Sequence, residues 1–541
     1  MSQLIKKIWK SPSFLKMLLS FDSQQNAFFK YFKVMPRHKD MTENIVLIQC
    51  VESLFYFGLF GQIVSSLREQ KSIRVEQFVL RSLNVGESDS ICACIKARFL
   101  NIPHSLKWTR LYGSFCDGIG YRSTSFNPIG DLIDLYAAWK RWIGLSDKKM
   151  LINLKILDIA VGDLVNDSFL RFKPAPTVDM KDIYLLILIW QAHRDMRRSM
   201  KYFKHIKPDL YLTSYCTYIQ HGIAVRVALA CGVQVFSFGD YQDLTKKLTL
   251  NDWFNLKNTD SYATAFAKLD NQKKKLALAK NALSARMAGV TDSATSYMKK
   301  SAYALSEDHV PNVKGAVIIF LHDFYDSPHI YPKVVFPDFW EWICFTVETL
   351  IEAKIPFFVK PHPNQISLSE AVLDDLKRRY ARLPIVPASI TNKQLAEAGM
   401  VCAVTVYGTV AHEMAYLGIP TITSAQHPHI SFDFCKTAKT KHEYAEMLRN
   451  FTDIKFDKIN MHKQSLIFYY MHNLNLEEEE KRLRDLAWEF RMECAKSEAN
   501  NIELINYMKK ISSSSSFKSL ILMWSNLLSV NCKKSETEHA N

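Results

Sequence analysis

Two stretches in the second half of the chain, FFVKPHPN at residues 357–364 and YGTVAHEMAYLGIPTIT at residues 407–423, decide the fold prediction. The first is an apolar run that stops at a cationic turn bracketed by prolines. The second reads as a Gly-Thr turn that opens a helix, with Gly418 as the helix stop and Pro420 at the start of the next strand. Both patterns are typical of a strand followed by a loop at the edge of a parallel sheet.

The chemistry of these two turns suits a phosphate group. A helix N-terminus offers free backbone N–H groups and a partial positive charge. The Thr409 hydroxyl and the Lys-Pro-His-Pro turn at residues 360–363 add further donors. We therefore expect this half of the protein to hold a nucleotide-activated donor by its phosphate.

Working outward, apolar runs alternate with helical segments through both halves, which predicts an α/β fold with parallel sheets. Residues 44–49, 208–214 and 233–239 are strands expected in the first half, and residues 316–321 begin the second. The predicted organisation is a basic leader at 1–40, a Rossmann-like acceptor domain with an insertion at 41–255, a helical connection at 256–312, a Rossmann-like nucleotide-sugar domain at 313–455 and a helical tail at 456–541.

Composition limits the class of protein and its partners. A length of 541 residues predicts two or three domains, and 48% hydrophobic with 23% charged residues is typical of globular proteins. The net charge of +15 favours anionic partners such as a phosphosugar, an acidic polysaccharide or an anionic membrane surface. Nucleic acid ranks last, because the basic residues are dispersed and no nucleic-acid-binding motif is present.

Cysteine usage and hydropathy indicate a cytoplasmic location. The eleven cysteines form no CxxC pair, and most lie inside apolar runs, as buried thiols do. Residues 1–40 lack the apolar core and small-residue cleavage site of a signal peptide. No apolar run is long enough to span a bilayer, and the amphipathic piece at 517–530 is expected to dock on the body or on a membrane.

At residues 360–363 (KPHP) and 408–413 (GTVAHE) the sequence resembles bacterial capsule and surface-polysaccharide transferases. This group includes the Kdo transferases of capsule assembly and the bacterial polysialyltransferases. The first half resembles the same group at Gly162-Asp163-Leu164 and at His221-Gly222, and so does the segment from Leu321 to His329. The resemblance covers about residues 156–424 and implies a GT-B glycosyltransferase, with two Rossmann-like domains facing a cleft and a helical C-terminal tail.

The resemblance implies roles for residues of the second half. The donor phosphate would be held by Lys360, His362, Pro363, Gly408, Thr409 and Glu413, with Glu413 accepting hydrogen bonds from ribose hydroxyls. His322 and Asp323 follow an apolar strand and would bind donor or act as acid and base. The structural alternatives stay open: Thr409 as a helix cap, Glu413 as an ordinary helical glutamate, and His322 with Asp323 as a loop pair.

In the first half, Asp163 and Asp167 are the candidates for base or nucleophile toward the sugar. Asp163 stands out because it follows a glycine where an apolar segment ends. Arg171, His221 and Arg226 would hold an anionic acceptor or the donor carboxylate. The alternative is that the aspartates cap a helix and that the three basic residues are structural.

No metal or other cofactor is expected. His427 and His429 have the spacing of a ligand pair, but the sequence indicates no carboxylate or cysteine beside them. The most consistent prediction is a cytoplasmic transferase, peripheral at a membrane, that passes a sugar from a nucleotide donor such as a CMP-linked acidic sugar to a capsule or lipopolysaccharide glycan or glycolipid. A sugar-nucleotide 2-epimerase and a catalytically silent assembly protein are the alternatives. Whether the reaction inverts or retains stays open.

Overall fold

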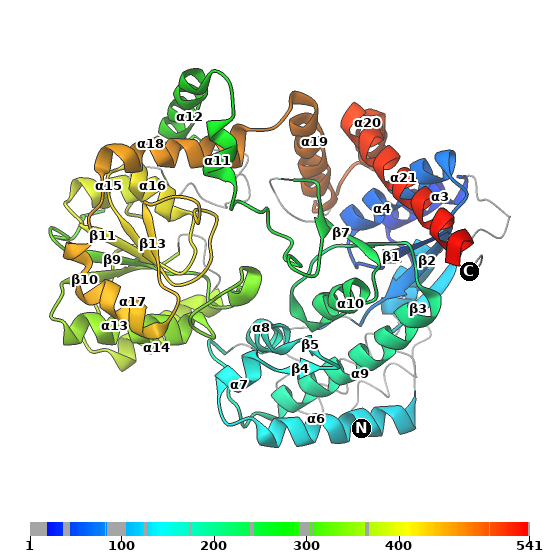
Figure 1. Ribbon diagram of the computed structural model, residues 1–541, viewed down its shortest axis with the longest axis horizontal. Helices are drawn as coiled ribbons and strands as arrows, with labels where there is room; N and C mark the ends of the chain where they lie inside the picture. The colour runs from blue at the N-terminus through cyan, green and yellow to red at the C-terminus, as the bar shows by residue number, and fades with distance from the viewer. Residues whose placement is uncertain are drawn as a thin grey trace. The chain divides into compact units, whose positions relative to one another are not determined.

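The computed structural model describes residues 19–35, 44–81, 83, 104–123, 127–173, 175–238, 243–290, 303, 308–362, 367–496 and 498–538 (Figure 1). These residues form two compact units. Unit 1 comprises Met1–Ser168, Met180–Asn255 and Glu477–Asn541, and unit 2 comprises Phe169–Asp179 and Leu256–Leu476. Each unit is built on its own sheet, so the predicted α/β class with two Rossmann-like parts and a helical C-terminal tail is confirmed.

Unit 1 contains a six-stranded sheet in the order β3-β2-β1-β6-β7-β8. All neighbours pair in parallel except the edge strand β8, which is antiparallel to β7. Strand β1 is almost wholly buried, as expected for an apolar run in the middle of a parallel sheet. The strands are β1 (Ile45–Gln49), β2 (Arg74–Val79), β3 (Gly118–Arg122), β6 (Leu210–Thr213), β7 (Gln234–Phe238) and β8 (Thr245–Leu248); β4 (Lys155–Ile156) and β5 (Ile159–Ala160) form a separate hairpin.

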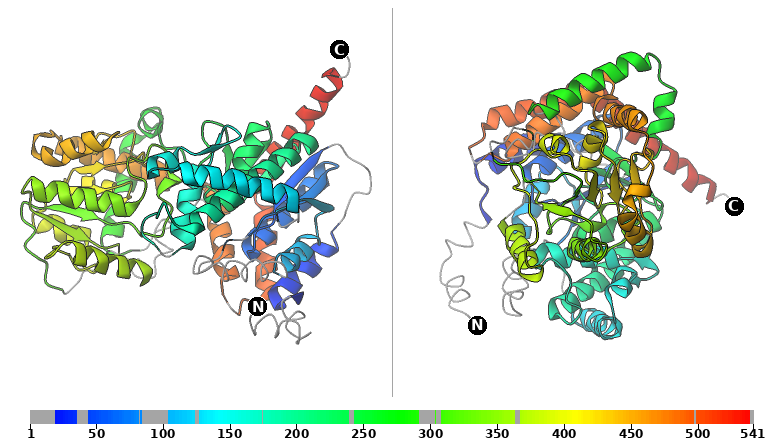
Figure 2. Two further views of the ribbon diagram at one scale, coloured as in Figure 1. Left: turned by 90° about the horizontal axis from the view of Figure 1, so that it is seen from below. Right: turned by 90° about the vertical axis from the view of Figure 1, so that its left-hand side faces the viewer.

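Side chains alternate between the two faces of this sheet. One face packs on helices from both ends of the chain, which lie side by side in Figures 1 and 2. The other face packs on α9, where Phe78 stacks on Phe203 at 5.6 Å. The helices of unit 1 are α3 (Ser23–Lys33), α4 (Leu54–Gln70), α6 (Pro128–Gly144), α7 (Lys148–Ile152), α9 (Ile183–Ile206), α10 (Tyr218–Ala230), α19 (Glu478–Cys494), α20 (Asn501–Ser513) and α21 (Ser515–Glu538); α8 (Gly162–Phe172) crosses the boundary between the units.

Unit 2 contains a five-stranded, fully parallel sheet in the order β10-β9-β11-β12-β13. The alternation is visible in β9, where Ile319 and Ile318 belong to separate apolar clusters on opposite faces. The strands are β9 (Val317–Phe320), β10 (Phe357–Lys360), β11 (Cys402–Thr405), β12 (Thr421–Thr423) and β13 (Cys435–Thr437). The helices are α11 (Tyr262–Ala267), α12 (Gln272–Met287), α13 (Phe339–Glu352), α14 (Ser367–Arg379), α15 (Asn392–Glu397), α16 (Val410–Tyr416), α17 (Lys441–Arg449) and α18 (Lys458–Tyr469), with short helical turns η1 (Pro328–Ile330), η2 (Phe451–Asp453) and η3 (Tyr470–Leu474).

The units differ from the expected division in two places. The segment expected as a helical connection belongs to unit 2, where α11 and α12 share an apolar cluster with α16 and α18. The expected tail is split, because α18 stays with unit 2 whereas α19, α20 and α21 complete the core of unit 1. An amphipathic pattern shows that a helix buries one face but does not show against which sheet.

Strand β3 is not among the strands that the sequence predicts for the first half. Its sequence, GIGYR, has two glycines and no apolar alternation, so it carries almost no strand signal. Gly120 is required by packing, since a Cβ there would lie 2.3 Å from a carboxylate oxygen of Glu76 and 2.4 Å from the hydroxyl of Tyr202.

The amphipathic piece at 517–530 docks on the body, which resolves the alternative left open above. Phe517, Ile521, Trp524 and Leu528 form its buried stripe. The ring of Trp524 packs against Phe236 at 5.6 Å and Phe238 at 6.0 Å, both on β7. In the described part of the chain, no helix combines the length and hydropathy needed to cross a bilayer.

We therefore expect Trp524→Ala to lower the free energy of unfolding by about 3–5 kcal/mol, because it empties a buried aromatic site. Leu522→Ala is the matched control on the same helix, since Leu522 is 54% exposed. Urea unfolding of both variants measures the difference. Equal, small losses would show that α21 does not belong to the core of unit 1.

Candidate functional site

The carboxyl end of the sheet in unit 2 gathers most of the predicted donor-site residues. Strand β9 leads to β10 on one side, and the chain then returns to β11 on the other side, so the strand order reverses between β9 and β11. Ligands of open parallel sheets bind outside the strand ends at such a switch point. His322, Lys360 and Gly408 follow or end β9, β10 and β11 respectively.

His322 joins the two strands at the switch point. Its Nε2 lies 3.0 Å from the Thr405 hydroxyl and accepts a hydrogen bond from the Val406 N–H at 3.3 Å. The ring stacks on Phe339 at 4.7 Å. Burial, with a further contribution from nearby His362, lowers the pKa of His322 to about 3. The ring is therefore neutral at pH 7, and its contacts with Thr405 and Val406 hold the β11 turn.

Asp323 and His362 interact beside this ring. The Asp323 carboxylate accepts hydrogen bonds from the Ser369 hydroxyl at 2.8 Å and the Tyr325 N–H at 3.1 Å. Burial lowers the pKa of His362, the Asp323 charge opposes this shift, and Lys360 adds to it. The pKa of His362 thus responds to the charges of both a carboxylate and an ammonium. Pro363, also predicted to hold donor, lies outside the described residues.

Lys360 is a buried cation at the end of β10, with 5% of its surface exposed. Its Nζ donates to the Ala388 carbonyl oxygen at 3.2 Å, and within the described residues the structure records no other hydrogen bond for it. Burial lowers the pKa of Lys360 to about 8, and Glu413 opposes the shift. The ammonium is therefore charged at neutral pH, and a buried charge with so few partners favours an incoming anion.

Glu413 lies on the same side as Lys360 but is held by protein groups. Its two carboxylate oxygens accept hydrogen bonds from the Tyr303 hydroxyl at 2.6 Å and the Asn392 amide at 2.8 Å. The Arg286 guanidinium approaches one oxygen to 4.0 Å. A ribose hydroxyl would have to share these oxygens with the present partners.

The turn between β11 and α16 carries Gly408 and Thr409. A Cβ on Gly408 would lie 2.8 Å from the Thr405 hydroxyl, so glycine permits this turn to approach Thr405 closely. The same hydroxyl lies 3.0 Å from His322 Nε2. Thr409 occupies the N-cap position without a side-chain capping bond. The hydroxyl therefore does not act as the helix cap that the sequence left as an alternative. Among the described residues, none is recorded as accepting from the N–H of Gly408 or Thr409.

Unit 1 has a comparable polar cluster at its own switch point, between β1 and β6. The Gln49 side-chain oxygen accepts bonds from the Thr213 hydroxyl at 2.8 Å and the Ser214 N–H at 2.7 Å. The Gln49 amide nitrogen lies 2.7 Å from His221 Nδ1. Burial lowers the pKa of His221 to about 4, so this ring is neutral as well.

Asp163 and Arg226 form one structural unit. Asp163 lies in the first turn of α8, not at a strand of the main sheet, and both of its oxygens bind the Arg226 guanidinium, one at 2.7 Å. Arg226 also donates to the Ala160 carbonyl and lies over the Trp253 ring at 4.8 Å. Use of Asp163 as a base or nucleophile would require this part-buried pair to open.

Asp167 and Arg171, also on α8, lie in different units. Asp167 is 3% exposed and accepts from the Asn166 amide at 3.2 Å. Arg171 is exposed and donates to the Tyr325 carbonyl oxygen at 3.2 Å within unit 2. Arg171 thus reaches the loop after His322 and Asp323, whereas His221 and Arg226 belong to unit 1.

Cys435 lies beside His427 and His429. One possible ligand atom of each of the three residues lies within 4.8 Å of the others. His427 already uses both ring nitrogens, since Nδ1 accepts from the His429 N–H at 3.0 Å and Nε2 lies 2.6 Å from the Thr437 hydroxyl. Burial also raises the pKa of the Cys435 thiol. An ion would have to break the His427 bonds and deprotonate the thiol, and the expectation of no metal stays a prediction.

Sequence reasoning missed several residues of these clusters. Gln49 and Thr405 each end an apolar strand, and a polar residue at that position was a usable signal. Cys435, Asn392 and Tyr303 come from distant segments, and nothing in the sequence links them to His429 or Glu413.

No protein-family model matches this chain, and no curated protein sequence matches it. Among solved structures, the chain resembles Thermosulfurimonas dismutans KpsC, a beta Kdo 2,4 transferase, with 11% identity, 49% of this chain and 79% of that chain covered, and a TM-score of 0.30. It also resembles the UDP-GlcNAc 2-epimerase of Methanocaldococcus jannaschii, with 11% identity, 78% and 97% covered, and a TM-score of 0.23.

A third similar structure is the wall teichoic acid polymerase TagF, with 10% identity, 56% of this chain and 61% of that chain covered, and a TM-score of 0.20. Identities and TM-scores this low assign no function to the chain. The class that the fold defines is a two-unit α/β protein with a parallel sheet and a polar switch point in each unit.

The buried histidines predict acid sensitivity. Their pKa values lie below the usual 6.5, so below pH 6.5 the unfolded chain binds more protons than the folded one and stability falls toward about pH 3. Each such histidine contributes a slope of up to about 1.4 kcal/mol per pH unit in that window. The residues are His193 and His221 (about 4), His322, His427 and His472 (about 3), and His362, His412 and His429.

We expect the Tm to fall steeply from pH 6.5 to 5 and His472→Phe to reduce that slope, because phenylalanine keeps the stacking on Phe468 without titrating. The exposed His442→Phe is the control and should leave the slope unchanged. A Tm that does not change with pH over this range would contradict the assignment of neutral buried rings.

A second prediction distinguishes a structural role of Asp163 from a catalytic one. Asp163→Asn should lower the free energy of unfolding by about 3–5 kcal/mol, because it leaves a buried guanidinium without its charge partner. Asp252→Asn removes the partner of the more exposed Lys246 and should cost no more than about 1 kcal/mol. A stable Asp163→Asn protein that has lost activity would instead point to a chemical role.

Proposed function

We propose that this protein is a glycosyltransferase that takes a sugar from a nucleotide donor and adds it to a surface-polysaccharide glycan. The donor phosphate binds in unit 2 at the ends of β9, β10 and β11. The observation that carries the proposal is Lys360, a buried ammonium with a single recorded hydrogen bond among the described residues.

The surroundings of Lys360 support an anion and not an apolar ligand. His362 is electrostatically coupled to Lys360, and the Gly408 and Thr409 turn contributes N–H groups and a hydroxyl that does not cap its helix. Donors fixed in a water-poor site stabilise the negative charge that develops on a leaving nucleotide. Glu413 limits the site on one side, where it offsets part of the Lys360 charge.

The reaction breaks the bond between the anomeric carbon and the nucleotide phosphate oxygen, and the electron pair leaves with the nucleotide. The acceptor hydroxyl forms the new bond and gives its proton to a base. Asp323 fits the base role better than the other candidates. Asp163 is paired with Arg226, Asp167 is 3% exposed, and His322 has a pKa of about 3.

The finer assignments are parts of the same proposal. The donor is a CMP-linked acidic sugar such as Kdo, and no metal takes part. The acceptor is a glycan or glycolipid held by unit 1 through His221 and its neighbours, with Arg171 reaching the β9 loop from α8. The protein acts in the cytoplasm, peripheral to the membrane that carries the acceptor.

The test is thermal stabilisation of the full chain by CMP, UDP, GDP and CDP, with Lys360→Met as the decisive variant. Loss of a charge-assisted hydrogen bond lowers nucleotide affinity about 10- to 100-fold. Methionine removes a buried charge at similar size, so the variant should be at least as stable as wild type and loss of binding cannot be blamed on unfolding. His362→Ala should weaken binding in the same direction.

Lys314→Met, on an exposed lysine of the same unit, is the matched control. Release of free nucleotide from a nucleotide sugar with added acceptor then separates the transferase from the alternatives. Interconversion of UDP-GlcNAc and its 2-epimer would identify the epimerase, and binding without any turnover would identify the silent assembly protein. No stabilisation by any of the four nucleotides would overturn the proposal.

A further inference from the structure

Helix α6 in unit 1 is amphipathic, but its apolar side faces solvent and its charged side faces the protein. Its large apolar side chains point to solvent, with exposed fractions of 74% for Ile129, 66% for Leu132, 61% for Ile133, 58% for Tyr136, 44% for Trp139 and 58% for Ile143. Spacings of three and four residues place these side chains along one stripe of the helix. We call this stripe the α6 face.

The charged side of α6 faces the protein instead. Asp134 is 3% exposed and binds the Arg197 guanidinium at 2.6 Å, and Asp131 binds Arg194 at 3.0 Å and Arg198 at 2.7 Å. These pairs fix the rotation of α6 against α9. The two helices lie side by side in Figure 1. The exposure of the α6 face is therefore set by part-buried ion pairs. A contiguous apolar stripe of this size marks an interaction surface.

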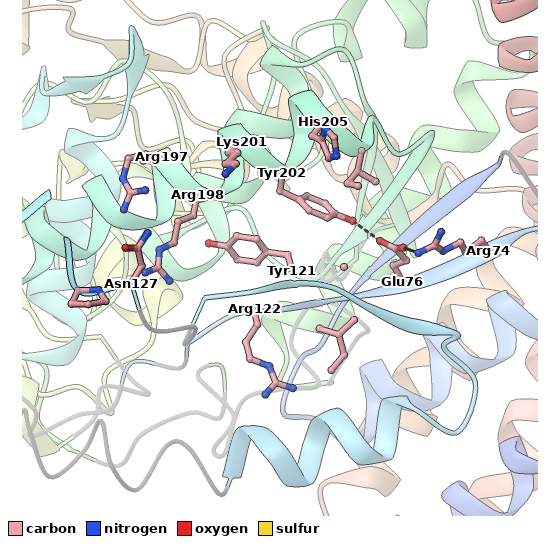
Figure 3. A pocket seen from close by; sticks show the side chains of 14 residues that line it. Arg74, Glu76, Tyr121, Arg122, Asn127, Arg197, Arg198, Lys201, Tyr202 and His205 are labelled. Carbon is pink, nitrogen blue, oxygen red and sulfur yellow. Dashed lines mark hydrogen bonds and ion pairs between the residues drawn. The ribbon is translucent and has the colours of Figure 1, made fainter. Parts of the chain in front are cut away.

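A basic pocket of about 740 Å³ adjoins the start of this face (Figure 3). Asn127 and Pro128 line the pocket, and Ile129 begins the α6 face at the next position. Arg197, Arg198, Lys201 and His205 line the pocket from α9, at spacings that put them on one side of that helix.

The cations of the pocket are partly paired already. Arg197 and Arg198 form ion pairs with Asp134 and Asp131 of α6. Glu76 is the carboxylate in the pocket lining, and it already accepts from the Tyr202 hydroxyl and pairs with Arg74. For Lys201 and His205, the described part of the chain offers no recorded ion pair or hydrogen-bond partner. A pocket of this kind suits a phosphate group.

We propose that the α6 face lies in the interfacial region of a membrane rich in anionic phospholipids, and that the basic pocket binds the phosphate of a lipid headgroup. The residue types fit this occupant. Tyr136 and Trp139 stack at 6.2 Å, and such amphipathic rings settle at the boundary between headgroups and acyl chains. Lys140 lies over the Tyr136 ring at 5.3 Å, within reach of the headgroups.

A second copy of the chain fits the face less well. A two-fold contact places each part of a surface against its own copy or its neighbour's. The α6 faces would then bring Lys140 of each copy near the other, beside two basic pockets, with no exposed acidic cluster on the face to offset them. An anionic membrane supplies the opposite charge.

This inference names the surface for the peripheral membrane location and to that extent rests on the proposed function. Its test is sedimentation of the full chain with vesicles in the absence of nucleotide, so its failure is distinct from failure of the donor site. Vesicles of phosphatidylcholine with about one quarter phosphatidylglycerol are compared with pure phosphatidylcholine. Wild type should bind the anionic vesicles, with affinity that falls as salt rises.

Two pairs of variants test the two parts. Ile129→Glu with Ile133→Glu should lower binding at least 10-fold, whereas Ile459→Glu with Ile502→Glu, at isoleucines 86% and 70% exposed elsewhere, should not. Lys201→Glu should lower binding about 10- to 30-fold, because it changes the charge at this position from +1 to −1 and so weakens the attraction to anionic lipids. Lys268→Glu, an exposed lysine of unit 2, is its control.

Two further measurements test whether the α6 face binds the membrane surface itself. Vesicles should shift the tryptophan emission to shorter wavelength in wild type and less in Trp139→Phe. Soluble glycerol phosphate should not release the protein, which separates a membrane surface from a free phosphate ligand. Equal binding by the α6 variants and their controls would overturn the proposal. So would a wild-type dimer in light scattering that becomes monomeric in the Ile129→Glu, Ile133→Glu protein, because a second copy would then cover the face.

Discussion

Both units depend on one constraint of strand order. In each sheet, the strand that comes first in the chain pairs in parallel with a later strand on each side. In unit 1, β1 lies between β2 and β6, and in unit 2, β9 lies between β10 and β11. This order brings loops from distant parts of the chain to one edge of each sheet. At each switch point a neutral histidine bonds to polar groups of the adjacent strand, His221 to Gln49 and His322 to Val406.

The difference between the two switch points lies in their charge. Unit 1 neutralises its nearby charges, since Arg226 and Asp163 pair with each other. In unit 2 the charge of the buried Lys360 ammonium has few partners, because Nζ makes one recorded hydrogen bond. The Glu413 carboxylate already interacts with three other protein groups. Burial of a charge is costly unless something binds it, so the cost of Lys360 is consistent with a function that needs it. The Lys360 site therefore carries the functional proposal.

How far the sequence could predict this arrangement depended on the kind of signal. Local turn chemistry located the β10 and β11 loops and their residues, because a strand end followed by Lys-Pro-His or Gly-Thr has few other meanings. It failed where position depends on distant partners. Asp163 looked like a strand-end carboxylate but pairs with Arg226 in the first turn of α8. The reversed α6 depends on ion pairs with α9 that no local pattern reveals.

The most direct test of the central claim is hydrogen exchange of the full chain with and without saturating CMP. Binding at the Lys360 site predicts slower exchange of the backbone N–H groups of Lys360, His362 and residues 408–413, with unit 1 unchanged. The Lys360→Met protein should show no such difference. Protection confined to the Gln49 and His221 cluster of unit 1, or none at all, would contradict a donor site in unit 2.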